Sequence, residues 1–248
     1  MSQRDTNDQS KAGAGVLETA YMGQAAGTYD TVRFTSRQGL AFDQLEREQL
    51  MHAVGLLPAE GTVLEVGCGT ARFAIQLARM GFRVAASDAS PDMLKIAREK
   101  ARGLTNIEFR QSEGLHVGFE TNRFDFAFAI RVMNSLESTQ YALDTAREMI
   151  RVTKPGGLVL IEFANAERPL ARQNNSARLS FGQLRALAAE QGCTVVRQSG
   201  VLVLSQTVLN AMPGFIVPAW VAVERALASM MWGLSSRGYI VLRKGRRS

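Results

Sequence analysis

The sequence predicts an α/β fold, a doubly wound, mostly parallel seven-stranded sheet with helices on both faces. Short, almost continuously apolar runs alternate with helical patterns from residue 62 to residue 163. Parallel strands that are covered on both faces have this composition. Glycine or proline stands at many of the boundaries, where helices and strands end. We also expect an N-terminal helical lid and a helical insertion before the last strand.

Seven stretches have the length and composition of strands: 62–66, 82–88, 107–111, 124–130, 158–163, 193–198 and 238–244. Helical patterns precede or separate them, chiefly at 45–57, 70–80, 90–103, 140–153 and 181–192. The clearest helix start is Ser90, an N-cap residue followed by Pro91 in the first turn. The stretch 154–157, Lys-Pro-Gly-Gly, is expected to end the fourth of these helices before the fifth strand begins.

The composition indicates one folded domain. The chain has 248 residues, of which 46% are hydrophobic and 21% are charged, as in folded globular proteins. Residues 1–15 are polar and are expected to form a disordered tail. Residues 16–248 are expected to form a single domain, with its ligand-binding core at about 45–165. The lid and substrate elements are then expected at about 16–44 and 165–236.

The charge and the cysteines restrict the class of partner. The net charge is +6, but the cations are spread out except for the cluster at 243–247, which has the character of a solvated end. No nucleic-acid partner is therefore expected. Cys68 and Cys193 form neither a disulfide framework nor a metal-binding spacing. With no apolar leader at the N-terminus and no transmembrane pattern, we expect a cytoplasmic protein.

The stretch 63–74, "VLEVGCGTARFA", predicts a ligand-binding turn. Gly67 and Gly69 allow a tight turn and a close approach of backbone to ligand, at the strand end where such sheets bind ligands. The dinucleotide fingerprint needs a third small residue where this chain has Arg72. Glu65, two residues before the first glycine, is also foreign to that fingerprint. A dinucleotide-dependent oxidoreductase therefore stays only as an alternative.

Five stretches, taken together, resemble the class I methyltransferases that use S-adenosylmethionine. They are "LEVGCGTARFA", "VAASDASPDML", "SEGLHVGF", "RFDFAFAIRVMNSL" and "REMIRVTKPGGLVLI". The resemblance implies S-adenosylmethionine as cofactor and S-adenosylhomocysteine as product. It implies that Asp88 binds both ribose hydroxyls, and that Glu113 stands where the family usually has Asp. Ala71 replaces a glycine that many members carry. The implied cofactor contacts are Glu65, Gly67, Cys68, Gly69, Asp88, Ala89, Met93, Glu113, Gly114 and Ile130.

The resemblance implies methyl transfer by in-line displacement, with positioning and desolvation as the main catalytic effects. The loop after the fourth strand lacks the Asn-Pro-Pro-Tyr clamp of nucleobase enzymes, so a small-molecule acceptor is expected. No acidic cluster or Cys/His spacing indicates a metal, and none is predicted. The catalytic group stays unassigned, with three candidates: His116, Arg131 and Tyr21.

The acceptor is expected to be apolar or aromatic, because the segment before the last strand is uncharged and contains methionine and tryptophan. From Trp220 onward, Val223, Leu227 and Met230 have helical spacing, as in a lid or a homodimer interface. A non-catalytic binding protein of the same fold is the second alternative function. The residues proposed to contact the acceptor are Tyr29, Arg33, Asn134, Met212 and Trp220.

Overall fold

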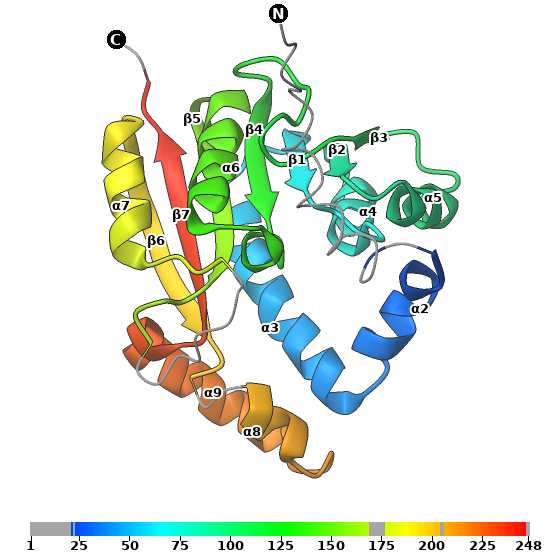
Figure 1. The fold of residues 1–248 in the computed structure, drawn as a ribbon, viewed down its shortest axis with the longest axis vertical. Coiled ribbons are helices and arrows are strands. Elements are labelled where there is room, and N and C mark those ends of the chain that lie inside the picture. The colour runs from blue at the N-terminus through cyan, green and yellow to red at the C-terminus, as the bar shows by residue number, and fades with distance from the viewer. Residues whose placement is uncertain (1–20, 22, 169–176, 204–205, 247–248) are drawn as a thin grey trace, which may run out of the picture.

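The centre of the molecule is a seven-stranded sheet (Figure 1). This computed structural model describes residues 21, 23–168, 177–203 and 206–246. The strand order is β3-β2-β1-β4-β5-β7-β6, and β7 is antiparallel to both of its neighbours while the other pairs are parallel. The predicted fold class is confirmed. The strands are β1 (Thr62–Val66), β2 (Arg83–Asp88), β3 (Ile107–Gln111), β4 (Phe124–Ala129), β5 (Thr153–Ala164), β6 (Cys193–Val201) and β7 (Arg237–Lys244).

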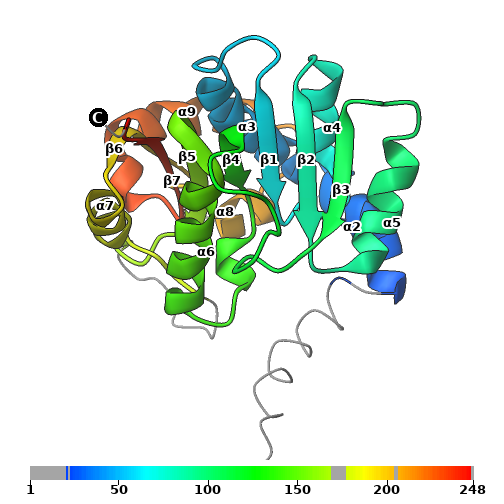
Figure 2. The same ribbon diagram turned by 90° about the horizontal axis from the view of Figure 1, so that it is seen from above.

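Helices cover both faces of the sheet, as Figure 2 shows. One core cluster joins the sheet to α3, α4, α5, α8 and α9, and the other joins it to α6 and α7. This double burial explains the apolar strands. The helices are α2 (Gly23–Phe34), α3 (Arg37–Val54), α4 (Arg72–Arg79), α5 (Pro91–Lys100), α6 (Thr139–Val152), α7 (Phe181–Glu190), α8 (Gln206–Ala211) and α9 (Val217–Met231), with two 3₁₀ turns, η1 (Met133–Ser135) and η2 (Trp232–Leu234).

The predicted cap of α5 is present, because the Ser90 hydroxyl accepts a hydrogen bond from the Met93 N–H at 3.2 Å. The start of β5 differs from the prediction. The strand begins at Thr153, opposite Phe124 of β4, and the register then shifts before the pair of Phe126 with Leu158. The glycine-containing stretch 154–157 therefore lies within β5 as an irregularity, and the preceding helix ends at Val152 without needing it.

The apolar residues at helical spacing from Trp220 onward are divided between the core and the surface of α9. Trp220 is 4% exposed, but Val223 is 51% exposed and Met230 is 83% exposed. Glu224 is buried instead, and its carboxylate accepts from the backbone N–H of Val203 at 2.7 Å. The buried side of the helix is made of Val217, Trp220, Val221 and Glu224.

Within the described part of the chain, no helix has both the length and the apolar character that crossing a membrane requires. The predicted disordered tail at 1–15 lies outside the described residues, as do parts of both predicted lid elements.

Candidate functional site

The turn after β1 is built from left-handed backbone conformations. Gly67 and Gly69 have φ values of 68° and 53°, and Ala71 has a φ of 61°. A Cβ atom on Gly67 would lie 2.4 Å from Cγ2 of Val132, which follows β4. A Cβ atom on Gly69 would meet no heavy atom within 4 Å outside its chain neighbours. Gly67 thus lets the ends of β1 and β4 close together, while Gly69 leaves open space that a ligand can approach.

Glu65 stands in the apolar run of β1 because its carboxylate caps α4. The N-cap residue of α4 is Ala71, which has no side-chain oxygen. Instead, Oε2 of Glu65 accepts from the N–H of Ala74 in the first helical turn at 2.8 Å. This contact holds the strand, the turn and the helix in one arrangement. Burial is the main cause that raises the pKa of Glu65 to about 8, and the Ala74 N–H and Arg72 only partly oppose it.

The raised pKa of Glu65 predicts a pH dependence of stability. Below its ordinary pKa of 4.5 the carboxyl is protonated in both the folded and the unfolded chain. Between that value and about 8, the unfolded chain loses a proton that the folded chain keeps. The Glu65 contribution to the free energy of unfolding therefore falls as pH rises, by up to about 1.4 kcal/mol per pH unit.

We expect Glu65→Gln to flatten part of this fall in urea unfolding between about pH 5 and pH 8. The exposed Glu60→Gln is the matched control, and it is expected to keep the wild-type profile. A folded Glu65→Gln protein with the wild-type profile would contradict the assignment.

The Asp88 carboxylate, at the end of β2, lies between the glycine turn and the start of α5. Its Oδ2 accepts from the Gly69 N–H at 2.7 Å, and its Oδ1 accepts from the Ser90 N–H at 2.8 Å. Burial raises the pKa of Asp88, while these backbone donors oppose the rise. Each carboxylate oxygen can accept more than one hydrogen bond. The arrangement therefore keeps acceptor capacity on both oxygens for a pair of hydroxyl donors.

The remaining residues proposed for the β1 and β2 ends lie beside this carboxylate. The Cys68 thiol is buried, and its burial raises its pKa, so the group is a neutral thiol at neutral pH. Its backbone N–H donates to the Ser87 carbonyl at 2.9 Å, which fixes the turn to β2. The Ala89 carbonyl accepts from Gln111 Nε2 at 3.2 Å. Met93 is fully buried at the start of α5.

The residues proposed after β3 lie against α6. Gly114 packs so closely that a Cβ atom would lie 2.7 Å from the Thr145 hydroxyl. The exposed Glu113 carboxylate faces Tyr141, with its Oε2 at 3.5 Å from the phenol oxygen. Burial first, and then the Glu113 charge, raise the pKa of Tyr141 to about 12. His116 is exposed and forms an isolated backbone bridge with Glu113.

Arg131 follows the buried Ile130 at the end of β4 and is held from two sides. Its backbone has a φ of 64°, and its N–H donates to Oε2 of Glu162 at 2.7 Å. Its side-chain Nε donates to Oε1 of Glu46 at 2.6 Å. Burial lowers the pKa of Arg131, but the Glu46 carboxylate outweighs that effect and the pKa is raised. The guanidinium lies 4.3 Å from the centre of the Phe42 ring.

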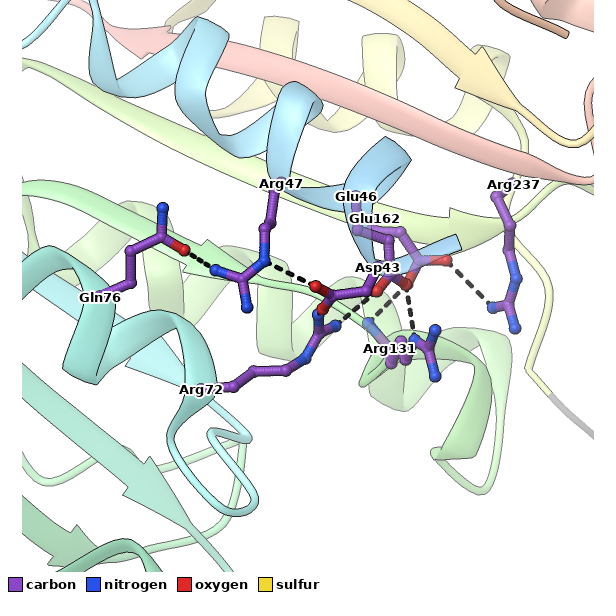
Figure 3. A network of polar contacts seen from close by, with 8 residues as sticks. All are labelled: Asp43, Glu46, Arg47, Arg72, Gln76, Arg131, Glu162 and Arg237. Atoms are coloured by element: carbon purple, nitrogen blue, oxygen red, sulfur yellow. Dashed lines mark hydrogen bonds and ion pairs between the residues drawn. The ribbon is translucent and has the colours of Figure 1, made fainter. Parts of the chain in front are cut away.

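Arg131 belongs to a buried network of charged groups that sequence reasoning missed (Figure 3). Glu46 also accepts from Arg72, and Glu162 also accepts from Arg237 at 3.0 Å. Both carboxylates are 0% exposed. A signal for it was present in the sequence, since Glu162 interrupts an apolar strand and Glu46 adjoins the buried Leu45. The network residues are Asp43, Glu46, Arg47, Arg72, Gln76, Arg131, Glu162 and Arg237.

A pocket of about 280 Å³ opens beside Arg131. Of the residues proposed for catalysis or acceptor binding, Arg33 and Arg131 line it. Tyr29 lies under the Arg33 guanidinium at 4.8 Å, and Tyr21 packs on Tyr29 with ring centres 6.1 Å apart. The lining residues are Val32, Arg33, Ser36, Gln38, Gly39, Phe42, Arg131 and Asn210.

The other proposed acceptor residues lie elsewhere. Asn134 is in η1, and its buried Oδ1 has no hydrogen-bond partner among the described residues. The Met212 carbonyl accepts from Gln38 Nε2 at 2.9 Å, and its side chain packs against the core. Trp220 is buried in the same core on α9. The Tyr21 carbonyl accepts from the Ser90 hydroxyl at 2.6 Å, and this bond joins the start of the N-terminal segment to the β2 end.

Comparisons with known proteins bear on these observations. The family model described as a methyltransferase domain matches residues 63–157. A demethylmenaquinone methyltransferase of Clavibacter sepedonicus is 29% identical over 157 residues, which cover 61% of this chain and 62% of the relative. A demethylmenaquinone methyltransferase of Staphylococcus carnosus is 31% identical over 137 residues, covering 52% of this chain and 56% of the relative. The chain thus matches less than two thirds of the length of these relatives.

Solved structures share the fold. The [4+2]-cyclase SpnF has a TM-score of 0.62 and is 21% identical, with 83% of this chain and 81% of that chain covered. Magnesium protoporphyrin IX methyltransferase from Synechocystis, with bound SAH, has a TM-score of 0.60 and 15% identity, with 84% and 86% covered. At this identity the likeness shows the fold alone. Residues 63–157, which fold from β1 into β5, thus match the methyltransferase domain, and the solved neighbours share the fold of most of the sheet and its helices.

Proposed function

We propose that this protein transfers the methyl group of S-adenosylmethionine to a small-molecule acceptor. The observation that carries the proposal is the Asp88 carboxylate at the glycine turn. Both of its oxygens are positioned by backbone N–H groups, and both keep acceptor capacity. The two hydroxyls of a ribose match that capacity, and the open space at Gly69 gives a ligand access to the same turn.

The residues present fit the cofactor. The Gly67–Ala71 turn would lie along its amino acid part, Asp88 would bind the ribose, and Met93 would lie near the base. When bound, the cofactor supplies a methyl group on a positively charged sulfur, which departs as a neutral thioether. The step therefore needs positioning and exclusion of water more than proton transfer. On this ground we propose a reaction that requires no metal.

The elements around the turn suit the exclusion of water. Helix α2 is tied to the turn, because the Thr70 hydroxyl donates to Oδ1 of Asp30 at 2.8 Å. It is also tied to α5, because the Gly23 N–H donates to Oδ2 of Asp92 at 2.7 Å. On the other side, Val132 packs against Gly67. These contacts place α2 and Val132 beside the turn, where desolvation of the acceptor would favour transfer.

The acceptor class is supported by the names of two relatives, which are demethylmenaquinone methyltransferases. A small acceptor with an apolar or aromatic part suits Val32 and Phe42 in the pocket beside Arg131. We also propose that the protein forms a homodimer and is located in the cytoplasm. Val223 and Met230 of α9 are exposed, and they are the first residues to substitute in a test for a dimer.

A different function on the same fold has one observation in its favour. A structural neighbour is named as a [4+2]-cyclase, and a fold does not by itself fix the chemistry that it hosts. The second candidate is therefore a protein that binds the cofactor and transfers no methyl group.

The decisive experiment has two stages. Purified protein is titrated with S-adenosylmethionine, S-adenosylhomocysteine and NAD by calorimetry. It is then incubated with methyl-labelled cofactor and a panel of phenols, quinones, amines and sugars, with and without a chelator. We expect binding of the first two ligands, no binding of NAD, and chelator-resistant labelling of one acceptor class. Binding without labelling supports the second candidate, and binding of NAD alone contradicts both.

Gly67→Ala is expected to weaken S-adenosylhomocysteine binding at least roughly tenfold, because the new Cβ would displace Val132 and strain the turn. The matched control is Gly103→Ala, which also has a positive φ but whose Cβ would meet no neighbour. Calorimetry that gives both variants the same affinity would mean that the turn tolerates a side chain.

A further inference from the structure

The geometry points to an anionic oxygen on the acceptor, a carboxylate or a phosphate, that is bound by Arg33 and Arg131 in the pocket beside Arg131. The inference rests on the proposed function, and it names the class of acceptor for that site. Two arginines line a pocket of about 280 Å³, and among the described residues no Asp or Glu lines it. Arginine presents a planar fork of donors that matches such oxygens.

The place of the pocket connects it to the reacting site. Arg131 directly follows the last residues of β4, and the next residue, Val132, touches the glycine turn. Arg33 comes from α2, the helix that is tied to the same turn through Asp30 and Thr70. A ligand in the pocket therefore lies next to the carboxyl ends of β1 and β4, where the cofactor is proposed to bind.

The Arg131 guanidinium is held in place before any ligand arrives, and the exposed Arg33 lies against an aromatic ring. Arg131 is fixed by Glu46 through Nε and lies over the Phe42 ring, and Arg33 lies over the Tyr29 ring. The bond to Glu46 uses Nε, so the two terminal nitrogens of Arg131 keep their donors. Arg131 also has a left-handed backbone, and residues held in such conformations concentrate at functional sites. Preorganised donors lose less entropy on binding.

The charged network that adjoins the pocket through Arg131 has an excess of positive charge. The network has three carboxylates, from Asp43, Glu46 and Glu162, against four guanidinium groups (Figure 3). Burial raises the pKa of Glu162, and protonation of that group would only add to the excess of positive charge. Arg33 adds a fifth cation, and within the described residues no carboxylate forms an ion pair with it. An anionic ligand would complete this balance.

The lining also includes groups that suit the rest of such a ligand. Ser36 and Asn210 offer hydrogen-bonding side chains at the rim. Phe42 and Val32 offer apolar contact. The small volume fits a compact acceptor, or the head of a longer one, since drug-sized pockets are about 300–1,000 Å³. We therefore expect an acceptor that has both an apolar or aromatic part and an acidic group.

The test compares charged and neutral probes that share a phenyl ring. Benzoate and phenyl phosphate are titrated against benzamide and benzyl alcohol, using the full chain saturated with S-adenosylhomocysteine. We expect at least one anion to bind roughly tenfold or more tightly than its neutral counterpart, and to weaken as salt is added. The tighter of the two anions identifies carboxylate or phosphate as the group.

Variants assign the binding to the pocket. Arg33→Met is expected to remove most of the preference for the anion, and Arg33→Lys to restore part of it. Arg131→Lys, which keeps a charge beside Glu46, is expected to weaken anion binding with less risk to folding than a neutral substitution. Arg79→Met is the control, because Arg79 is an exposed arginine at the end of α4, outside this pocket. It is expected to bind the probes as wild type does.

Each remaining outcome decides against the inference. Equal binding of charged and neutral probes, absence of binding by both anions, or an unchanged preference in Arg33→Met would overturn it. The affinity for S-adenosylhomocysteine is measured in the same samples. If that affinity is normal while the anion preference is absent, the acceptor assignment fails and the proposed function stands. If S-adenosylhomocysteine does not bind at all, the proposed function fails first.

Discussion

Asp88→Ala is expected to weaken S-adenosylhomocysteine binding by about 1.5–3 kcal/mol, or roughly 10- to 150-fold, the scale of hydrogen bonds to a charged group. The variant loses the acceptors proposed for the ribose hydroxyls. It also leaves the N–H groups of Gly69 and Ser90 without their present partner. The turn is therefore expected to loosen, and a lower melting temperature should accompany the weaker binding. Calorimetry on protein that circular dichroism shows to be folded measures the effect.

The control for Asp88 is Glu99→Ala, which removes an exposed carboxylate from α5, the helix that follows β2. It is expected to keep the wild-type affinity and melting temperature. Both variants change the net charge equally, so a difference between them cannot come from charge alone. An Asp88→Ala protein that is folded and binds with wild-type affinity would remove Asp88 from the cofactor site.

Glu46→Ala is expected to lower the free energy of unfolding by about 3–5 kcal/mol, the usual effect of removing one partner from a buried ion pair. Glu46 is 0% exposed and accepts from both Arg72 and Arg131. Its removal leaves Arg131 buried without the carboxylate that holds its side chain. Whole domains have a free energy of unfolding of about 5–15 kcal/mol, so this loss is a large fraction of the total stability. Urea unfolding measures it.

Glu48→Ala, on the same helix, is the control for Glu46. Glu48 pairs with Arg225, and the two side chains are 34% and 45% exposed. Exposed pairs contribute about 0–1 kcal/mol, so a small change is expected. Similar losses in the two variants would show that the network gives α3 no special stability. If Glu46→Ala does not fold, Glu46→Gln is measured in its place. This variant keeps one acceptor oxygen, and its free energy of unfolding is expected to lie between that of Glu46→Ala and that of wild type.

The sequence by itself determined the parts of the protein that depend on neighbouring residues. Apolar strands between helical patterns predicted the sheet, because each strand must be covered on two faces. Gly67 and Gly69 predicted the turn, since a left-handed backbone is a local property that glycine permits. Ser90 and Pro91 predicted the start of α5, because helix capping and the fixed φ of proline are also local properties. The resemblance in the five stretches then indicated the methyltransferase domain.

Only the tertiary structure decided which distant side chains meet. Glu46 and Arg131 are 85 positions apart, and no local pattern pairs them. The pocket is formed by residues from α2, α3, the end of β4 and α8, so its positive charge was visible only after folding. Packing decided which apolar residues of α9 face the core, since Val217, Trp220 and Val221 are buried while Val223 and Met230 are exposed. Pairing with β4 likewise drew the start of β5 back to Thr153. In each case the deciding energy is a contact between segments far apart in the chain, and periodicity reports only on contacts within one segment.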